Sequence, residues 1–241
     1  MNSKNLFIFI QARLNSKRYP KKIIKKIKNK TFIEIMMSRL KELNKKYQII
    51  FLIPNDKKND SLNFFLKKKG YKVERGSNNN VLSRFYSAAK KNNAENIMRL
   101  TSDCPLIDYK ICEKLIKIFF KKKLNYAYVG RSYADGLDCE IFDFRSLQKI
   151  YKIKNLKRND KEHVSLYFRK NKKKFKYFQL KNKKDDSKVR ITLDYPSDFE
   201  VIKSVINNFR EILKGRYVSY RNIVKFIKKN NVVKKANLQK V

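Results

Sequence analysis

A cationic segment at residues 11–22 is the first candidate for chemistry in this chain. It reads Gln-Ala-Arg-Leu-Asn-Ser-Lys-Arg-Tyr-Pro-Lys-Lys and directly follows an apolar run. Guanidinium and ammonium groups, helped by main-chain N–H groups, are the donors that bind phosphate oxygens. The segment predicts a polyphosphate-binding loop built on Arg13, Arg18 and Lys22; a solvated loop of a lysine-rich protein is the alternative. Neither GxGxxG nor GxxxxGK[ST] occurs in the chain, which disfavours a dinucleotide fingerprint or a Walker loop.

Two aspartates stand in a shared pattern further along the chain. Asp103 and Asp194 each follow an apolar run and precede a proline by two residues. If both lie at strand ends, the two carboxylates could share one Mg²⁺, a cation that prefers oxygen ligands. Taken singly, each could instead be a cap or turn residue. Asp108 and Asp198 are expected at the N-cap and in the first turn of the helices that follow.

Short apolar runs alternate with amphipathic stretches along the whole sequence. The runs expected to be strands are 6–10, 48–53, 71–74, 96–100, 126–129, 137–142, 175–180 and 190–193. The stretches expected to be helices begin at Thr31, where Glu34 completes a capping-box spacing, and continue at 62–69, 81–91, 109–122, 144–152, 162–169, 197–209 and 220–229. Single helices between strands favour βαβ units, and therefore an α/β, three-layer, Rossmann-like fold with a mostly parallel sheet. No Pro/Gly/Ser-rich linker interrupts 1–241, and the polar stretch 181–188 is expected to be a loop, so a single domain is predicted.

Composition limits the classes of function. The 241 residues include 61 Lys+Arg against 21 Asp+Glu, a formal net charge of +40. Such a charge suggests a polyanionic partner, although a general lysine bias would also produce it. No apolar run reaches the ~20 residues of a membrane span, and no signal peptide is evident, so a cytoplasmic protein is expected. The three cysteines form no CxxC pair, which argues against a disulfide framework or a zinc ribbon.

Six segments in one order resemble a known family. IQARLNSKRYPKK is similar to the AR-x-GS-x-R-x-P-x-K signature of the sugar-acid cytidylyltransferases, and RLTSDCPLID is similar to their metal-binding aspartate motif. RGSNNNVLSRFYSAAKK, DGLDCEIF, KEHVSLYFRKN and RITLDYPSDFEVIK resemble more narrowly the spore-coat polysaccharide type. The resemblance implies a single domain of the nucleotide-diphospho-sugar transferase type. It also implies a nucleotidyltransferase that converts CTP and a sugar or sugar acid to a CMP-sugar and pyrophosphate with Mg²⁺, for surface polysaccharide or glycan biosynthesis.

The same resemblance implies roles for particular residues. The nucleotide would contact Ala12, Arg13, Ser16, Arg18 and Lys22, with Arg75, Gly76 and Arg84 near the base and ribose. Mg²⁺ would bind Asp103 and Asp194. Catalysis would rest on Arg13, Lys22 and Asp103. The acceptor site would be lined by Asp135, Asp138, Glu140, Glu162 and His163, although His163 could equally cap or pack within its helix.

The signature loop departs from the family pattern at two positions. Asn15 stands where the signature has its first glycine, and Lys21 stands where a glycine usually follows the proline. Asn tolerates a left-handed backbone better than most residues, so the first exchange could preserve the turn. Lys21 would weaken the loop if its position requires a positive φ, and nucleotide preference or activity could then differ.

Two other functions remain open. One is a basic nucleic-acid-binding module without catalysis, supported by the +40 charge and by aromatic residues among lysines near Phe175. It lacks a helix-turn-helix, zinc-finger or RNP-like signature, so nucleic acid is not the expected partner. The other keeps the fold but uses another nucleoside triphosphate or a sugar without a carboxylate. A homodimer is possible and the acceptor sugar is not specified.

Overall fold

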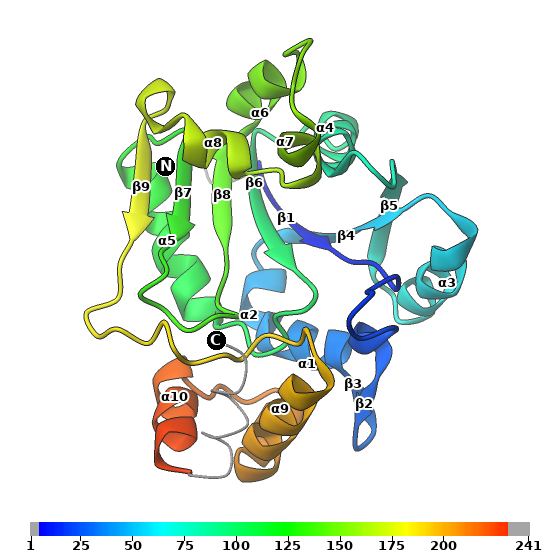
Figure 1. Cartoon of the computed structure of the whole chain (residues 1–241), viewed down its shortest axis with the longest axis vertical. Coiled ribbons are helices and arrows are strands. Elements are labelled where there is room, and N and C mark those ends of the chain that lie inside the picture. Colours follow the sequence, from blue (N-terminus) through cyan, green and yellow to red (C-terminus); the bar gives the residue numbers. More distant parts are fainter. Residues whose placement is uncertain (1–4, 231–241) are drawn as a thin grey trace.

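The computed structural model describes residues 5–230. Its centre is a seven-stranded sheet in the order β5-β4-β1-β6-β8-β7-β9 (Figure 1). The strands are β1 (Leu6–Gln11), β4 (Gln48–Pro54), β5 (Lys72–Gly76), β6 (Asn96–Thr101), β7 (Tyr126–Val129), β8 (Glu140–Asp143) and β9 (Tyr177–Leu180). Only β8 runs antiparallel to its two neighbours, β6 and β7. The predicted α/β class with a mostly parallel sheet is confirmed.

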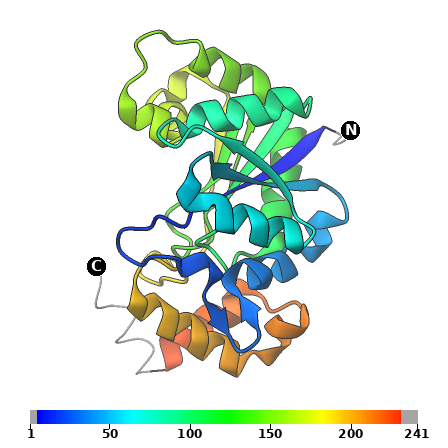
Figure 2. The ribbon, with the colours of Figure 1, turned by 90° about the vertical axis from the view of Figure 1, so that its right-hand side faces the viewer.

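The sheet has a separate apolar core on each face. β1 lies between β4 and β6, and its near-continuous apolar sequence supplies both cores: Ile8 and Ile10 point to one and Phe9 to the other. The core around Ile8 is completed by α1 (Phe32–Arg39), α2 (Lys41–Asn44), α3 (Asp60–Lys68), α5 (Tyr109–Lys121), α9 (Pro196–Asn208) and α10 (Tyr220–Lys229). The core around Phe9 is completed by α4 (Val81–Lys91), α6 (Phe144–Tyr151) and α8 (Leu166–Lys170). Figure 2 shows α4 and α6 at one end of the molecule and α9 and α10 at the other.

Helix caps follow the predicted residues. Thr31 and Glu34 form the capping box of α1. Asp108 caps α5 by accepting from the N–H of Lys110 at 2.9 Å. Asp198 lies in the first turn of α9. Each carboxylate thus sits where unpaired helical N–H groups favour it.

Three predicted elements are wrong in detail. Residues 190–193 form no strand; only Arg190 makes a bridge, with Asp135, because the N–H groups of Ile191 and Leu193 donate to two different loops, at Asp135 and Asp103. The helix expected at 162–169 is interrupted: α7 (Arg158–Glu162) ends before α8 begins. The helix that begins at Thr31 breaks between α1 and α2 at Leu40.

The sequence pattern also missed a hairpin, β2 (Lys26–Ile27) with β3 (Lys30–Thr31), whose strands are too short for a hydrophobic alternation. The loop predicted at 181–188 is present. Within residues 5–230, no helix is long and apolar enough to cross a membrane.

Candidate active site

The loop after β1 is organised around the backbone of Leu14. Its carbonyl oxygen accepts hydrogen bonds from the N–H groups of Ser16, at 2.9 Å, and of Lys21, at 3.1 Å. Its own N–H donates to the side-chain oxygen of Asn59, 2.9 Å away, and Asn59 is fully buried. The Asn59 amide donates in turn to the carboxylate of Asp56 at 2.7 Å. The shape of the loop is therefore fixed by contacts within the protein.

Lys21 has a left-handed backbone, with φ 55° and ψ 19°, directly before a short 3-10 helix, η1 (Lys22–Ile24). The position of the second missing glycine thus does require a positive φ, which costs a non-glycine residue roughly 1–2 kcal/mol. Asn15, at the first missing glycine, is not among the described residues with positive φ. That exchange does not depend on the tolerance of Asn for the left-handed region.

Lys22 joins the two aspartates predicted to bind metal. Its ammonium nitrogen lies 2.8 Å from Oδ1 of Asp194 and 3.2 Å from Oδ2 of Asp103. Lys22 is only 7% exposed, so these carboxylates replace water around its charge. Arg18 adds a second cation, with Nη2 2.9 Å from Oδ1 of Asp194 and its guanidinium 4.8 Å from the centre of the Tyr195 ring. Four predicted site residues from three distant segments therefore form one cluster.

Backbone contacts hold the two aspartate loops side by side. The carbonyl oxygen of Asp103 accepts from the N–H of Leu193 at 2.8 Å and from the hydroxyl of Thr192 at 3.1 Å. The carboxylate of Asp198 accepts from the N–H of Asp194 at 2.8 Å. Residues 190–193, which were predicted to be a strand, thus form a largely buried connection that fixes Asp194 opposite Asp103.

The Asp103 and Asp194 carboxylates have the chemistry of a divalent-cation site. Mg²⁺ is commonly held by one or two carboxylates together with substrate phosphate oxygens. Burial alone would raise the pKa of Asp194, but the hydrogen bond and charge of Lys22, with the charge of Arg18, hold it below its ordinary value. Within residues 5–230, no group of three or more His, Cys, Asp or Glu side chains could hold a metal. A cation at this pair would complete its coordination with oxygen atoms of water or of a substrate.

Arg84, on α4, is one of the residues predicted to lie near the base and ribose, and its hydrogen bonds are made within the protein. Its guanidinium is buried and donates to the carbonyl oxygen of Ser77 at 2.7 Å. Burial, followed by the charge of nearby Arg13, lowers the pKa of Arg84 to about 10. A Cβ atom at Gly76 would lie 2.9 Å from Cγ of Arg84, so glycine leaves the space that Arg84 crosses. Arg13, whose charge acts on Arg84, is itself exposed to solvent.

Arg75 and Ala12 also contact their surroundings through structural bonds. Arg75 pairs with Asp60 at 2.7 Å and donates to the carbonyl oxygen of Asp56 at 2.9 Å. The N–H of Ala12 donates to the carbonyl oxygen of Leu52 at 3.1 Å. These contacts join the start of the loop after β1 to β4, and β5 to the segment that follows β4.

Asp135 and Asp138 line a cavity of about 590 Å³. Burial raises the pKa of Asp135 to about 6, even though Arg190 Nη1 lies 2.5 Å from its carboxylate, and the charges of Asp138, Asp194 and Asp103 raise it further. Burial also raises the pKa of Asp138. The N–H groups of Ile191 and Leu193 donate to the carbonyl oxygens of Asp135 and Asp103, at 2.7 and 2.8 Å, so the cavity lies close to the Lys22 cluster.

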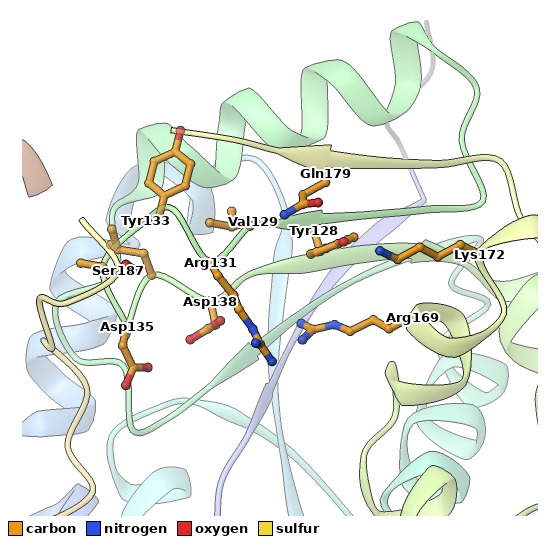
Figure 3. Close-up of a pocket in the computed structure, with 13 residues that line it drawn as sticks. Tyr128, Val129, Arg131, Tyr133, Asp135, Asp138, Arg169, Lys172, Gln179 and Ser187 are labelled. Atoms are coloured by element: carbon orange, nitrogen blue, oxygen red, sulfur yellow. The ribbon is translucent and has the colours of Figure 1, made fainter. Parts of the chain in front are cut away.

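The opposite side of this cavity is cationic. Arg131, Arg169 and Lys172 line it together with the amide of Gln179, and Figure 3 shows these side chains with Asp135 and Asp138 around one space. None of these four residues was predicted from the sequence to be part of the site. Arg131, Arg169 and Lys172 look like the lysine- and arginine-rich surface elsewhere in the chain, and no motif marks Gln179.

Glu140 lies beneath this cavity rather than in its lining. It is 1% exposed, pairs with Arg99 at 2.8 Å and with Arg169, and accepts from the Tyr126 hydroxyl at 2.8 Å. Burial alone would raise its pKa, but Arg99 and Arg169 lower it to about 2. Arg99 also donates to the side-chain oxygen of Gln11, 3.1 Å away. Glu140 therefore holds Arg169 at the cavity and connects it with the end of β1.

The structure does not bring Glu162 and His163 to this cavity. Both side chains are exposed, at the end of α7, and neither lines it. The backbone N–H of His163 donates to the carbonyl oxygen of Asn159 at 2.8 Å. His163 is thus the residue that closes α7, which is the alternative that the sequence left open.

Comparison with known proteins identifies a matching family model and several similar proteins. A family model described as cytidylyltransferase matches residues 7–238. A cytidylyltransferase structure from Leptospira borgpetersenii has 33% sequence identity and a TM-score of 0.87, with 98% of each chain covered. The spore coat polysaccharide biosynthesis protein SpsF of Bacillus subtilis is 27% identical over 207 residues, which are 83% of this chain and 86% of SpsF.

A more distant structure shares the fold. It is a CMP:2-keto-3-deoxy-manno-octonic acid synthetase complexed with CTP, with a TM-score of 0.63 and 14% identity, covering 85% of this chain and 99% of its own. At this identity the likeness concerns the arrangement of strands and helices alone.

Proposed function

The chain belongs to the cytidylyltransferase family, and on that premise we propose that it joins the CMP group of CTP to a sugar or sugar acid. A hydroxyl oxygen of the sugar attacks the α-phosphorus, pyrophosphate leaves, and a CMP-sugar forms. The observation that carries this proposal is the cluster of Lys22, Asp103, Asp194 and Arg18 beside a polar cavity. The similarity to SpsF supports a role in surface polysaccharide or glycan biosynthesis.

The loop after β1 would receive the triphosphate. Arg13, Arg18 and Lys22 offset its negative charge. Such transfers depend on charge neutralisation and in-line placement rather than on a protein nucleophile. The contact between Leu14 and buried Asn59 keeps this loop in position without a ligand to order it.

Asp103 and Asp194 would hold the divalent cation, with Mg²⁺ as the proposed ion. When bound, such a cation polarises the α-phosphate and neutralises charge at the leaving group. The two carboxylates share the Lys22 ammonium group, which can turn to a phosphate oxygen when its partners bind a cation. Lys22 would therefore pair with Asp103 and Asp194 in the free protein and with the nucleotide in the complex.

The cavity lined by Asp135 and Asp138 would receive the acceptor. Carboxylates can accept hydrogen bonds from sugar hydroxyls, and Arg169, Lys172 and Gln179 offer donors on the other side. Mixed donors and acceptors in a cavity of about 590 Å³ suit a monosaccharide, since pockets of roughly 300–1,000 Å³ are usual for small ligands. Glu162 and His163 could reach the acceptor only if α7 moves.

The proposal extends to compartment and assembly. The three cysteines are buried free thiols, which supports a reducing compartment such as the cytoplasm. Small nucleotides and sugars, rather than nucleic acid, are the proposed partners, and a homodimer is the proposed assembly. Light scattering at two protein concentrations tests the assembly.

A pyrophosphate-release screen tests the function. The full chain with MgCl₂ is combined with each of the four nucleoside triphosphates and with a panel of sugar acids, neutral sugars and amino sugars. Release with CTP and one class of acceptor is expected. Release with another triphosphate instead of CTP would show that CTP is not the donor. Release with a neutral sugar alone would show that the acceptor is not a sugar acid.

A further inference from the structure

A second cavity lies on the other side of the segment that borders the acceptor cavity. It has a volume of about 620 Å³ and lies between residues 182–186 and α10. Ser187 lines the acceptor cavity, whereas Asp186 lines this one. None of the residues that line it belongs to the Lys22 cluster, so it is a separate site.

Buried polar contacts hold the wall 182–186 against α10. Asp186, which is 7% exposed, pairs with Lys228 at 2.5 Å and accepts from the Asn182 amide at 2.9 Å. The side-chain oxygen of Asn182 accepts from the Tyr220 hydroxyl at 3.0 Å. The N–H of Asp186 donates to the carbonyl oxygen of Ser132 at 2.9 Å. The cavity is therefore built by specific contacts, and its one acidic lining residue is already paired.

Cationic side chains line this cavity on both walls. Arg221, Lys225 and Lys229 recur every four residues and so form one stripe along α10. Lys183 and Lys184 face them from the opposite wall. Within the described part of the chain, none of these five residues forms an ion pair with a carboxylate. Like charges at i and i+4 destabilise a helix, and an anion between the walls would remove this repulsion.

We propose that this cavity binds a small ligand carrying two or more adjacent phosphate-type groups. Six ammonium and guanidinium groups line this concave space, counting Lys228, which pairs with Asp186. They suit several clustered negative charges better than a single carboxylate. The concavity favours a compact ligand over a duplex or a membrane, both of which need an open surface. This site is independent of the proposed reaction.

Binding of inorganic tripolyphosphate tests the proposal. The full chain is titrated by calorimetry at two salt concentrations, as the wild type and as the double variant Lys183→Gln/Lys225→Gln. The matched control is Lys67→Gln/Lys68→Gln on α3, which removes the same charge from an exposed surface. Thermal melts confirm that all three proteins fold.

We expect the wild type and the control to bind tripolyphosphate at this site, in addition to any binding at the loop after β1. The Lys183→Gln/Lys225→Gln variant should lose roughly tenfold or more in affinity for tripolyphosphate at this site. Each substitution removes a charge-assisted hydrogen bond to a phosphate oxygen, which is stronger than a neutral hydrogen bond. Hydrogen exchange should show tripolyphosphate protection of 182–188 and 220–229 in the wild type and none in that variant.

Two results would overturn the proposal. One is equal tripolyphosphate binding by the variant and the α3 control. The other is a variant effect confined to a single-stranded oligonucleotide or to anionic lipid vesicles, tested in parallel arms, because a macromolecular surface would then be the occupant. Neither result bears on CTP use, since the readout is binding outside the Lys22 cluster.

Discussion

The ammonium nitrogen of Lys22 lies 2.8 Å from Oδ1 of Asp194, although 172 residues separate them in the chain. This contact joins the loop after β1 to the segment before α9, and Asp103 completes it from the end of β6. In the proposed reaction, the same three side chains serve the triphosphate and the divalent cation. The consequences of this arrangement can be measured one residue at a time.

Asp103→Asn should reduce pyrophosphate release by about 10²–10³-fold, the usual cost of removing one strong electrostatic stabiliser. The thermal melt should barely change, because Asn keeps an oxygen acceptor for Lys22 and the Asp103 side chain is 32% exposed. Steady-state pyrophosphate release and a melt are measured together. Asp185→Asn, an exposed aspartate in the 181–188 loop, is the control and should keep full activity. Full activity in Asp103→Asn would remove Asp103 from the mechanism.

Lys21→Gly should stabilise the protein by about 1 kcal/mol, because glycine adopts a left-handed backbone without the steric cost that Lys21 bears. Chemical denaturation measures the change in free energy of unfolding. Lys25→Gly is the matched control: its φ is −63°, so glycine there should destabilise by adding freedom to the unfolded chain. A destabilised Lys21→Gly variant would mean that the lysine side chain holds the loop.

Sequence patterns predicted the sheet because most of its strands are buried, apolar and separated by amphipathic helices. The central run at 6–10 is β1, and the helix at 81–91 matches α4 to the residue. Residues 190–193 have the same apolar character but bond to two loops, and no local signal distinguishes such a connection from a strand. The helix predicted at 162–169 is interrupted at His163, whose φ of −108° and ψ of 86° are not helical, and no glycine or proline in the segment marks this break.

Glu140→Gln should lower the free energy of unfolding at pH 7 by about 3 kcal/mol, because the variant loses the carboxylate charge that pairs with Arg99 and Arg169. The folded-state pKa of Glu140, about 2, lies below its ordinary value of 4.5. Its contribution is therefore complete above pH 4.5 and is lost as the pH falls toward 2. Denaturant titrations between pH 2 and 7 should show a flatter acid limb in the variant than in the wild type. Glu200→Gln, at an exposed site, is the control, and parallel profiles for the wild type and Glu140→Gln would contradict the ion-pair account.

Asn59→Ala should raise the KM for the nucleotide, because the buried N–H of Leu14 loses its acceptor and the loop after β1 loses its anchor. The unsatisfied group should also cost about 1–3 kcal/mol of stability. Kinetics with varied nucleotide and fixed acceptor, together with denaturation, measure both effects. Asn63→Ala is a nearby control, since the side-chain oxygen of Asn63 has no hydrogen-bond partner within the described residues. An unchanged KM in Asn59→Ala would show that the loop keeps its shape without this contact.

Motif order located the phosphate and cation side of the site but not the cations of the acceptor cavity. Lys22, Asp103 and Asp194 each stand two residues from a proline, which gives them a recognisable local context. Arg169 and Lys172 lie in a lysine-rich stretch, and tertiary contacts with Glu140 and the Tyr126 hydroxyl distinguish Arg169. Glu140 belongs to a recognisable acidic segment, yet its burial beneath the cavity depends on the pairing of β8 with β6.

Phosphorus NMR of the reaction tests the central claim most directly. The wild-type chain is incubated with CTP, MgCl₂ and the acceptor that the screen identifies, and the phosphorus signals are integrated over time. The account predicts that the CTP signals are replaced by equal amounts of pyrophosphate and one new phosphodiester, the CMP-sugar. Pyrophosphate accompanied by free CMP and no phosphodiester, or equal turnover of all four triphosphates, would contradict it.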